Sequence, residues 1–517
     1  EKGSPGPKCH LHRHRLDKKP LFVLSYKNSL STGCAQQPLP ASHKDTEHRE
    51  TERVMEKNRD SGNPRIVMLP WLAHGHVSPF LELAKNLSTR NFRIYFCSST
   101  VILNALKHHL VPSHDEENEE RPWYSSIELV DLHCPSLPSL PSHLHTTNAL
   151  PPHLMPQLRR VFDLSVSNVS NVLRTVNPGL FIYDVNFSWS SVPKEDQGLF
   201  DRIPAVLFSS FSAATMSAAF HAITRPAATY PFPALLASIL QAMQPRHPDF
   251  DTDQSQASQG LVHTINRSSD ILLIKTFQEM EGEHIHLLSE MTKKKVVPVG
   301  TVVQDCDNGR SDDRLIQWLD DKEESTTVFV AFGSESFLTA EEMGEVAHGL
   351  ELSGVNFMWV VRFPKGEEVA IHDALPRGFL ERTKGRGLVV EGWAPQATIL
   401  RHPSVGGFLS HCGWSSVMES MKIGVPIIAM PLQLDQPVNA RVVEQMGVGL
   451  EIKRDEKGRY GRSEIGRGVR DLMAGKGGEG ARMKAAELGG VLRRKDEEDI
   501  HRVARQLLHL CASSNIN

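Results

Sequence analysis

The stretch that decides the fold of this chain is Trp393–Gln436, which reads WAPQATILRHPSVGGFLSHCGWSSVMESMKIGVPIIAMPLQLDQ. Near its middle, the apolar run Val405–Leu409 predicts a strand that leads into the polar turn Ser410–Ser416 and then into a helical pattern. Free backbone N–H groups and the positive end of a helix make such a junction a binding site for phosphate groups. Gly413 lets an anion approach the backbone closely. The junction therefore predicts a ligand that carries phosphate.

Strand and helix patterns alternate on both sides of this stretch. The spacing between strands leaves room for crossover helices, which predicts an α/β chain with a parallel, doubly wound sheet in each half. We expect two facing Rossmann-like domains, with ligands in a cleft between them at the carboxyl ends of the strands. The expected strands are Arg65–Leu69, Phe92–Cys97, Leu180–Tyr183, Ala205–Phe208, Ile271–Ile274, Thr327–Phe332, Phe357–Val361, Leu388–Glu391, Val405–Leu409 and Pro426–Met430.

A polar linker at about Gln304–Asp313 separates the two predicted domains, which span 55–303 and 304–484. The amphipathic segment 485–517 is expected to form a C-terminal helix that packs back on the first domain. Residues 1–54 are rich in Lys, Arg, His, Pro and Ser and show no periodicity, so we expect a disordered leader outside the fold.

The composition narrows the classes of function. With 57 basic and 61 acidic side chains the net charge is −4, which argues against a nucleic-acid partner. The seven cysteines form no C-x-x-C pair, which favours a reducing, cytoplasmic compartment. No stretch offers the run of about 18 apolar residues that a membrane span needs. A monomer is expected.

The first predicted strand is followed by a helix signal. Ser78 and Pro79 are a typical N-cap and first-turn pair. Phe80, Ala84 and Leu87 then fall on one helical face. We expect the helix to begin at this pair, with the residues before it in a loop.

Over its whole length, Trp393–Gln436 resembles the signature box of the plant UDP-sugar-dependent glycosyltransferases of secondary metabolism. The match includes W-A-P-Q, H-C-G-W, E-S, G-V-P and D-Q in the same order. The resemblance implies the two-domain GT-B fold, a UDP-sugar as co-substrate, and neither a cofactor nor a metal. An asparagine usually stands in that family where this chain has Ser415. This serine and the end of the box look most like the branch that elongates the sugar chain of a glycoside.

The resemblance gives each part of a bound UDP-sugar its own residues. Trp393 would stack on the uracil, although the same residue could be an ordinary buried aromatic. His411 would donate to the diphosphate, although it could merely cap a strand. Asp435 and Gln436 would hold the hexose hydroxyls, and Gln436 fits glucose. The full donor set is Ser334, Trp393, Ala394, Gln396, His411, Trp414, Ser415, Ser416, Glu419, Asp435 and Gln436.

The catalytic residues are expected in the first domain. Gly75–His76 resembles the family's Gly-His pattern, which makes His76 the general base and leaves His74 as the alternative. A neutral imidazole suits this role because its ordinary pKa is about 6.5. By the same resemblance, Asp184 at a strand end orients the imidazole. The competing interpretation of Asp184 is a loop or helix-cap aspartate.

The predicted reaction is an inverting transfer of a hexose, preferably glucose, to a hydroxyl of a small molecule. Acceptors that fit are flavonoid, terpenoid and steroidal glycosides, and their choice would depend on the loops 134–156 and 221–262. Glucosylation of the aglycone itself and a catalytically silent nucleotide-sugar-binding protein remain as alternatives. A nicotinamide oxidoreductase would need a glycine fingerprint after a strand. Gly475–Gly480 matches that pattern but follows a helical stretch, so a flexible turn is expected there.

Overall fold

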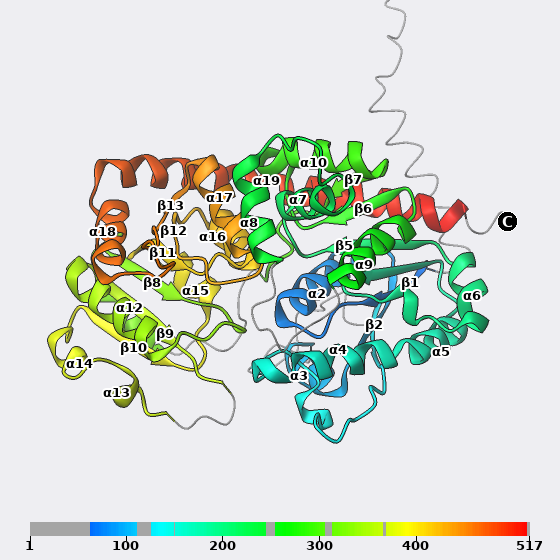
Figure 1. Cartoon of the computed structure of the whole chain (residues 1–517), viewed down its shortest axis with the longest axis horizontal. Helices are drawn as coiled ribbons and strands as arrows, with labels where there is room; N and C mark the ends of the chain where they lie inside the picture. The colour runs from blue at the N-terminus through cyan, green and yellow to red at the C-terminus, as the bar shows by residue number, and fades with distance from the viewer. Residues whose placement is uncertain are drawn as a thin grey trace, which may run out of the picture. The chain divides into compact units, whose positions relative to one another are not determined.

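The computed structural model describes residues 63–110, 126–148, 150–243, 254–304, 313–364 and 369–513. They form two parallel β-sheets, one from each half of the chain (Figure 1). The predicted leader, residues 1–54, lies outside the described residues.

The first sheet has the strand order β3-β2-β1-β4-β5-β6-β7, and every neighbouring pair is parallel. Its strands are β1 (Arg65–Leu69), β2 (Arg93–Ser98), β3 (Ile127–Asp131), β4 (Leu180–Asp184), β5 (Ala205–Ser209), β6 (Ile271–Ile274) and β7 (Lys295–Pro298). The α-helices of this half are α2 (His74–Ser88), α3 (Thr100–Leu110), α4 (Met155–Leu164), α5 (Val166–Val176), α6 (Gln197–Arg202), α7 (Ala213–Thr224), α8 (Pro233–Ala242), α9 (Gln254–Arg267) and α10 (Gln278–Thr292).

The second sheet has the order β10-β9-β8-β11-β12-β13 and is also parallel throughout. Its strands are β8 (Thr327–Ala331), β9 (Asn356–Val361), β10 (Gly387–Glu391), β11 (Val405–Ser410), β12 (Ile427–Ala429) and β13 (Gly449–Glu451). The α-helices of this half are α11 (Asp313–Asp320), α12 (Ala340–Ser353), α13 (Ile371–Ala374), α14 (Phe379–Arg382), α15 (Gln396–Arg401), α16 (Trp414–Ile423), α17 (Gln436–Met446), α18 (Arg462–Met473) and α19 (Lys476–Ser513).

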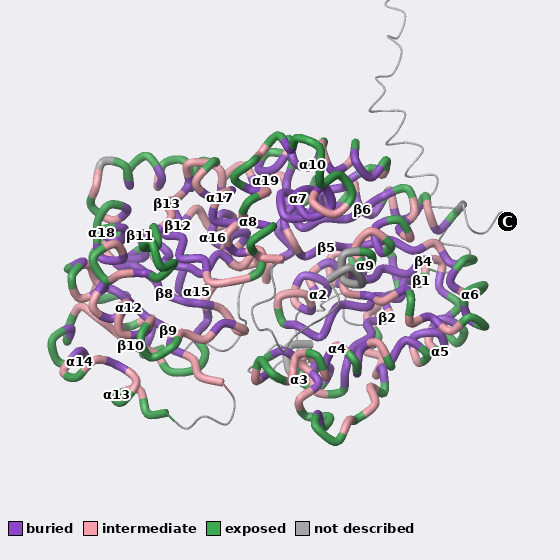
Figure 2. Tube along the Cα trace, viewed as in Figure 1, coloured by how far each residue is buried: buried purple, intermediate pink, exposed green. Residues whose placement is uncertain are grey.

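The predicted strands are all present, and each agrees with the structure to within one residue at either end. Their residues are apolar because both faces of a parallel sheet are covered by helices, as the buried β4, β5 and β11 illustrate (Figure 2). Three strands were missed, namely β3, β7 and β13. All three stand at an edge of their sheet, and β3 and β13 contain no fully buried residue, so they lack the apolar run of a central strand.

The start of α2 differs from the prediction. The helix begins at His74, with Ala73 as its N-cap residue, so Ser78 is not the cap and Pro79 lies inside the helix. Pro79 has no N–H to donate to the carbonyl of Gly75, so the helix lacks one hydrogen bond there. The N–H groups of His76 and Val77 already donate to the Ala73 carbonyl. As a result, the first turn of a helix holds His76 in place.

A shared apolar core joins the two halves. Buried residues of α7, α8 and α10 pack together with buried residues of α16 and α17 in one cluster. Phe277 from the first half and Trp414 and Met418 from the second half are members of it. The halves therefore contact each other through packed side chains as well as through polar groups.

The long helix α19 contacts both halves (Figure 1). It packs on α16 and α18 and continues past α2, β4 and β7. Asp496 accepts hydrogen bonds from the backbone N–H and the hydroxyl of Thr301, at 2.8 and 2.7 Å. The helix begins at Lys476, and most of the segment Gly475–Gly480 forms its first turn. The prediction of a flexible turn there is therefore wrong.

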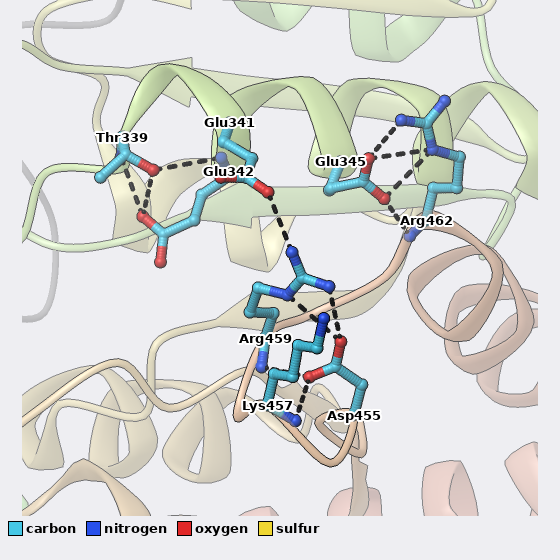
Figure 3. Close-up of polar contacts among 8 residues, drawn as sticks. All are labelled: Thr339, Glu341, Glu342, Glu345, Asp455, Lys457, Arg459 and Arg462. Carbon is cyan, nitrogen blue, oxygen red and sulfur yellow. Dashed lines mark hydrogen bonds and ion pairs between the residues drawn. The ribbon is translucent and has the colours of Figure 1, made fainter.

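Exposed polar contacts fasten the outer helices of the second half (Figure 3). Thr339 and Glu342 form a capping box at the start of α12. Glu345 of the same helix accepts hydrogen bonds from the backbone and the guanidinium of Arg462, at 2.6 and 3.0 Å, where α18 starts. Exposed ion pairs of this kind contribute little to the free energy of unfolding. Their role here is to align the start of α18 with α12.

Candidate active site

His76 and Asp184 meet at the point where the strand order of the first sheet reverses. β1 and β4 are neighbours there; His76 lies in the first turn of α2, which follows β1, and Asp184 is the last residue of β4. Nδ1 of His76 lies 2.7 Å from Oδ2 of Asp184. The carboxylate is fully buried, and its other oxygen accepts from the backbone and the side chain of Asn186 at 2.9 and 3.0 Å. With Nδ1 donating to Asp184, Nε2 of His76 is left as the proton acceptor.

The pKa of His76 lies above its ordinary value. Burial acts to lower the pKa, but the charge and the hydrogen bond of Asp184 raise it, and Glu335 and Asp435 add to the rise. Glu335 follows β8 and Asp435 precedes α17, so both belong to the second half. Groups of the second half therefore act electrostatically on the imidazole of the first. His74, the alternative base, is an exposed residue at the start of α2.

His411 lies at the equivalent reversal point of the second sheet, where β8 and β11 are neighbours. It follows the end of β11, and its ring is enclosed by two glycines. A Cβ atom on Gly333 or Gly413 would lie 2.5 or 2.6 Å from Nε2 of His411. The side chain is only 8% exposed, and Nδ1 has no hydrogen-bond partner in the structure. Burial lowers the pKa of His411 to about 4, so the ring is neutral.

Three of the predicted donor residues converge on one contact. Nε2 of Gln396 donates to Oε2 of Glu419 and, at 3.3 Å, to Oγ of Ser416. Gln396 begins α15, while Ser416 and Glu419 lie in α16. Close by in the chain, Ala394 is buried, but the Trp393 side chain is 52% exposed. The interpretation of Trp393 as an ordinary buried aromatic is therefore wrong.

Asp435 and Gln436 stand at the start of α17. The Asp435 carboxylate accepts a hydrogen bond from Nδ2 of Asn439 at 2.7 Å, and burial raises the pKa of Asp435. Asn439 also donates to the Cys412 carbonyl at 3.0 Å and accepts from Ser212 of the first half at 3.0 Å. The side-chain oxygen of Gln436 accepts from the N–H groups of 432 and 433, which fixes the loop before the helix.

Further polar contacts cross between the halves around the start of α16. Nε1 of Trp414 donates to the Lys275 carbonyl at 2.6 Å, and Nζ of Lys275 donates to Oγ of Ser415 at 3.0 Å. Ser334 lies in the turn after β8, next to Glu335, which accepts from Oγ1 of Thr147 at 2.6 Å. These contacts join the start of α16 and the turn after β8 to residues of the first half.

Sequence reasoning missed three residues here, namely Lys275, Glu335 and Asn439. Lys275 follows β6 directly and Glu335 comes soon after β8, so both occupy the strand-end positions where ligand sites of parallel sheets lie. That signal was available in the sequence. The part played by Asn439 depends on a contact with the other half, which no local pattern encodes.

The described residues hold no group of three or more His, Cys, Asp and Glu side chains placed to bind a metal ion. None of the helices in the described ranges is both long and apolar enough to cross a membrane.

Fold and site together define a glycosyltransferase of the GT-B class. Residues 64–303 match the family described as "Glycosyltransferase, N-terminal domain", and residues 292–461 match "UDP-glucoronosyl and UDP-glucosyl transferase". The chain belongs to this family of UDP-dependent glycosyltransferases, and a UDP-sugar is its co-substrate.

Named relatives match most of the chain. UDP-glucosyltransferase 29 of Panax ginseng is 46% identical over 457 residues, which cover 88% of this chain and 98% of that protein. Beta-D-glucosyl crocetin beta-1,6-glucosyltransferase of Gardenia jasminoides is 43% identical over 448 residues, or 86% and 98% of the two chains. Among solved structures, Phytolacca americana UGT2 complexed with UDP-2fluoro-glucose and pterostilbene has a TM-score of 0.63 and 28% identity, and covers 87% of this chain and 99% of its own.

Proposed function

We propose that this enzyme transfers glucose, with inversion at the anomeric carbon, from UDP-glucose to a sugar hydroxyl of a small-molecule glycoside. The observation that carries the chemistry is the hydrogen bond between His76 of α2 and the fully buried Asp184 of β4. The charge of Asp435, from the second half, also raises the pKa of the His76 imidazole. A base in one half and a sugar-binding carboxylate in the other suit transfer between two bound molecules.

The proposed reaction is a single displacement. Nε2 of His76 takes the proton of the acceptor hydroxyl, and Asp184 holds the ring in the required tautomer and stabilises the imidazolium. The acceptor oxygen then forms a bond with the anomeric carbon of glucose while the bond from that carbon to the β-phosphate oxygen breaks. UDP leaves with the electron pair of the broken bond. One displacement at one carbon inverts its configuration.

The donor is held, in this proposal, by the second half. The indole of Trp393 stacks on the uracil, and Gln396 and Glu419 bind the nucleoside. His411, Ser416 and the N–H groups at the start of α16 bind the diphosphate. The remaining residues assigned to the donor are Ser334, Ala394, Trp414, Ser415, Asp435 and Gln436.

Each half of the chain, with its own sheet, binds one of the two substrates in this proposal. We assign acceptor binding to 55–303 and UDP-sugar binding to 304–484, with 485–517 packing back on the acceptor half and 1–54 outside the catalytic fold. We also propose a monomer in the cytoplasm. The cysteine pattern supports the compartment, and the molar mass in solution would test the oligomeric state.

A sugar hydroxyl as acceptor is supported by the likeness to beta-D-glucosyl crocetin beta-1,6-glucosyltransferase, whose name describes transfer to a glucosylated molecule. The test is to incubate the chain from Met55 onward with UDP-glucose, UDP-galactose, UDP-xylose or UDP-glucuronate. Matched pairs of aglycone and monoglycoside serve as acceptors, and mass spectrometry and the anomeric NMR coupling report the products. We expect a β-linked glucose added only to the monoglycosides. If only the aglycones were turned over, the enzyme would glucosylate the aglycone itself. UDP binding without any transfer would indicate a catalytically silent binding protein.

A further inference from the structure

Lys275 is a lysine buried at the junction of the two halves. It follows β6, its side chain is only 1% exposed, and its Nζ donates to Oγ of Ser415 at 3.0 Å. Its own carbonyl accepts from the indole of Trp414 at 2.6 Å. The segment is thus fixed to α16 by both backbone and side chain, and the amine is held at the first turn of that helix.

This position is unfavourable for a cation by itself. A buried ammonium loses its hydration, and the first turn of a helix carries partial positive charge. Among the described residues, no carboxylate lies within ion-pair distance of Lys275. Glu419, Glu82 and Asp496 act on it from further away, and Lys422 opposes them. The site therefore places the ammonium beside the positive end of a helix, and the carboxylates that act on it lie beyond ion-pair distance.

The turn beside Lys275 also carries a second group that points to a ligand. Nδ1 of His411 is buried and has no hydrogen-bond partner. The atom of this ring that would lie nearest to a Cβ atom on Gly413, the N-cap residue of α16, is Nε2. A buried hydrogen-bonding group without a partner costs free energy that a bound ligand would recover. An anion at this turn would form an ion pair with the ammonium and would accept hydrogen bonds from the neutral imidazole and from the free N–H groups of the helix.

We propose that Lys275 belongs to the diphosphate subsite, where its ammonium reaches from the acceptor half to the phosphates of UDP and neutralises the charge that develops on the departing UDP. The inference rests on the proposed function only for the identity of the donor. Both halves would then form the diphosphate subsite, because Lys275, directly after β6, supplies the cation and α16 supplies the N–H groups.

The titration of Lys275 agrees with this role. Burial lowers the pKa of Lys275 to about 7, so both the charged and the neutral amine are accessible near neutral pH. A diphosphate nearby would favour the charged form and raise the pKa again. The other charged groups that face the amine are Glu419 and Lys422 of α16, Glu82 of α2 and Asp496 of α19.

The experiment compares UDP with uridine, which lacks the phosphates, by isothermal titration calorimetry on K275M. We expect UDP to bind about 10- to 100-fold more weakly to K275M than to the wild type, with uridine unchanged. K294M is the matched control, because Nζ of Lys294 donates only to the Ser268 and Ser269 carbonyls and should leave both ligands unaffected. E419Q should weaken UDP and uridine alike, because Glu419 is assigned to the ribose.

Equal losses for UDP and uridine in K275M would show a merely structural role and overturn the proposal, as would unchanged UDP affinity. The wild type and K275R provide a second test that does not require K275M to fold. In buffers of different ionisation enthalpy, UDP binding to the wild type should take up protons. K275R, which stays charged, should keep the UDP affinity and abolish that uptake. A loss of UDP affinity in K275R as large as that in K275M would also overturn the inference. These measurements contain no acceptor, so they stand apart from the choice of glycoside.

Discussion

The imidazole of His411 fills the space that a side chain at Gly333 would need, at the reversal point of the second sheet. A Cβ atom at 333 would lie 2.5 Å from Nε2 of His411. The glycine follows β8 and the histidine follows β11, so the turns after two neighbouring strands interlock. The backbone of Gly333 also has φ = +78°, which side chains disfavour. The position of His411 therefore depends on a missing side chain at 333.

Replacing Gly333 with alanine should displace His411. We expect G333A to bind UDP about tenfold more weakly, through loss of one hydrogen bond to a charged ligand. The left-handed backbone should lower the free energy of unfolding by about 1–2 kcal/mol. Calorimetry and urea unfolding measure the two effects. G344A in α12 is the control, since a Cβ there meets no atom within 4 Å. Wild-type UDP affinity in G333A would contradict the role given to His411.

Removing the imidazole of His76 tests the general base. H76A should lower kcat by roughly 10²- to 10⁴-fold, the usual contribution of a positioned base. UDP affinity should stay within about twofold of the wild type, because His76 is assigned to the acceptor side. H74A is the matched control and should keep most of the activity. The assignment would move to His74 if the two variants behaved the other way round.

The pH dependence should follow His76. A base works in its neutral form, so the rate should rise with pH through the pKa of His76, which is raised above 6.5. D184N removes the carboxylate that raises this pKa, so the acid limb of the kcat/KM profile should move to lower pH. The plateau rate should fall by about 10²-fold or more, because the tautomer is no longer held. D201N, an exposed aspartate paired with Arg267, serves as the control. An acid limb that does not move would exclude His76 as the titrating group.

The exposed indole of Trp393 should contribute to donor affinity. Stacking of a base on an aromatic ring contributes about 1–3 kcal/mol, so W393A should raise the KM for UDP-glucose by roughly 5- to 150-fold. W393F keeps a smaller ring and should lose less. Because the contact involves the base, W393A should weaken uridine and UDP to the same degree in calorimetry. Unchanged uridine binding would remove Trp393 from the nucleoside site.

Asn439 should act as a positioning residue for Asp435. N439A removes the donor that holds the Asp435 carboxylate at 2.7 Å, so the sugar should be held less well while the nucleotide is not affected. We expect a fall of about tenfold in kcat/KM for UDP-glucose with UDP affinity retained. S212A is the matched comparison, since it removes only the contact from the first half and should lose less activity. Parallel losses of UDP affinity and turnover would indicate general disruption instead.

Much of the fold could be predicted because both faces of each parallel sheet are buried. Central strands such as β4 and β5 are buried along their whole length, whereas the edge strands β3, β7 and β13 are less fully buried and left no such signal. The start of α2 was misplaced because Ser78 and Pro79 have the local chemistry of a cap, while the observed N-cap, Ala73, makes no side-chain hydrogen bond.

Within the site, the sequence indicated those residues that can be recognised from the short segment in which they stand. His76, Asp184 and His411 each follow or end a strand at a reversal point, and the signature stretch names most of the donor set. Asn439 could not be recognised in this way, and the strand-end position of Lys275 does not reveal which residue it contacts. Their positions matter because of contacts with Ser415 and Ser212, which lie in the opposite half and far away in the sequence.

The long helix α19 sets a rule for building hybrid enzymes from this chain. A hybrid that takes its acceptor half from one relative and its donor half from another would normally be spliced at the linker alone. Here the later part of α19 is fitted to the acceptor half, since Asp496 lies against Gly300 and Thr301 and Cys511 against Gly179. The tail should therefore be inherited with the acceptor half, and a single splice point would leave those partners mismatched.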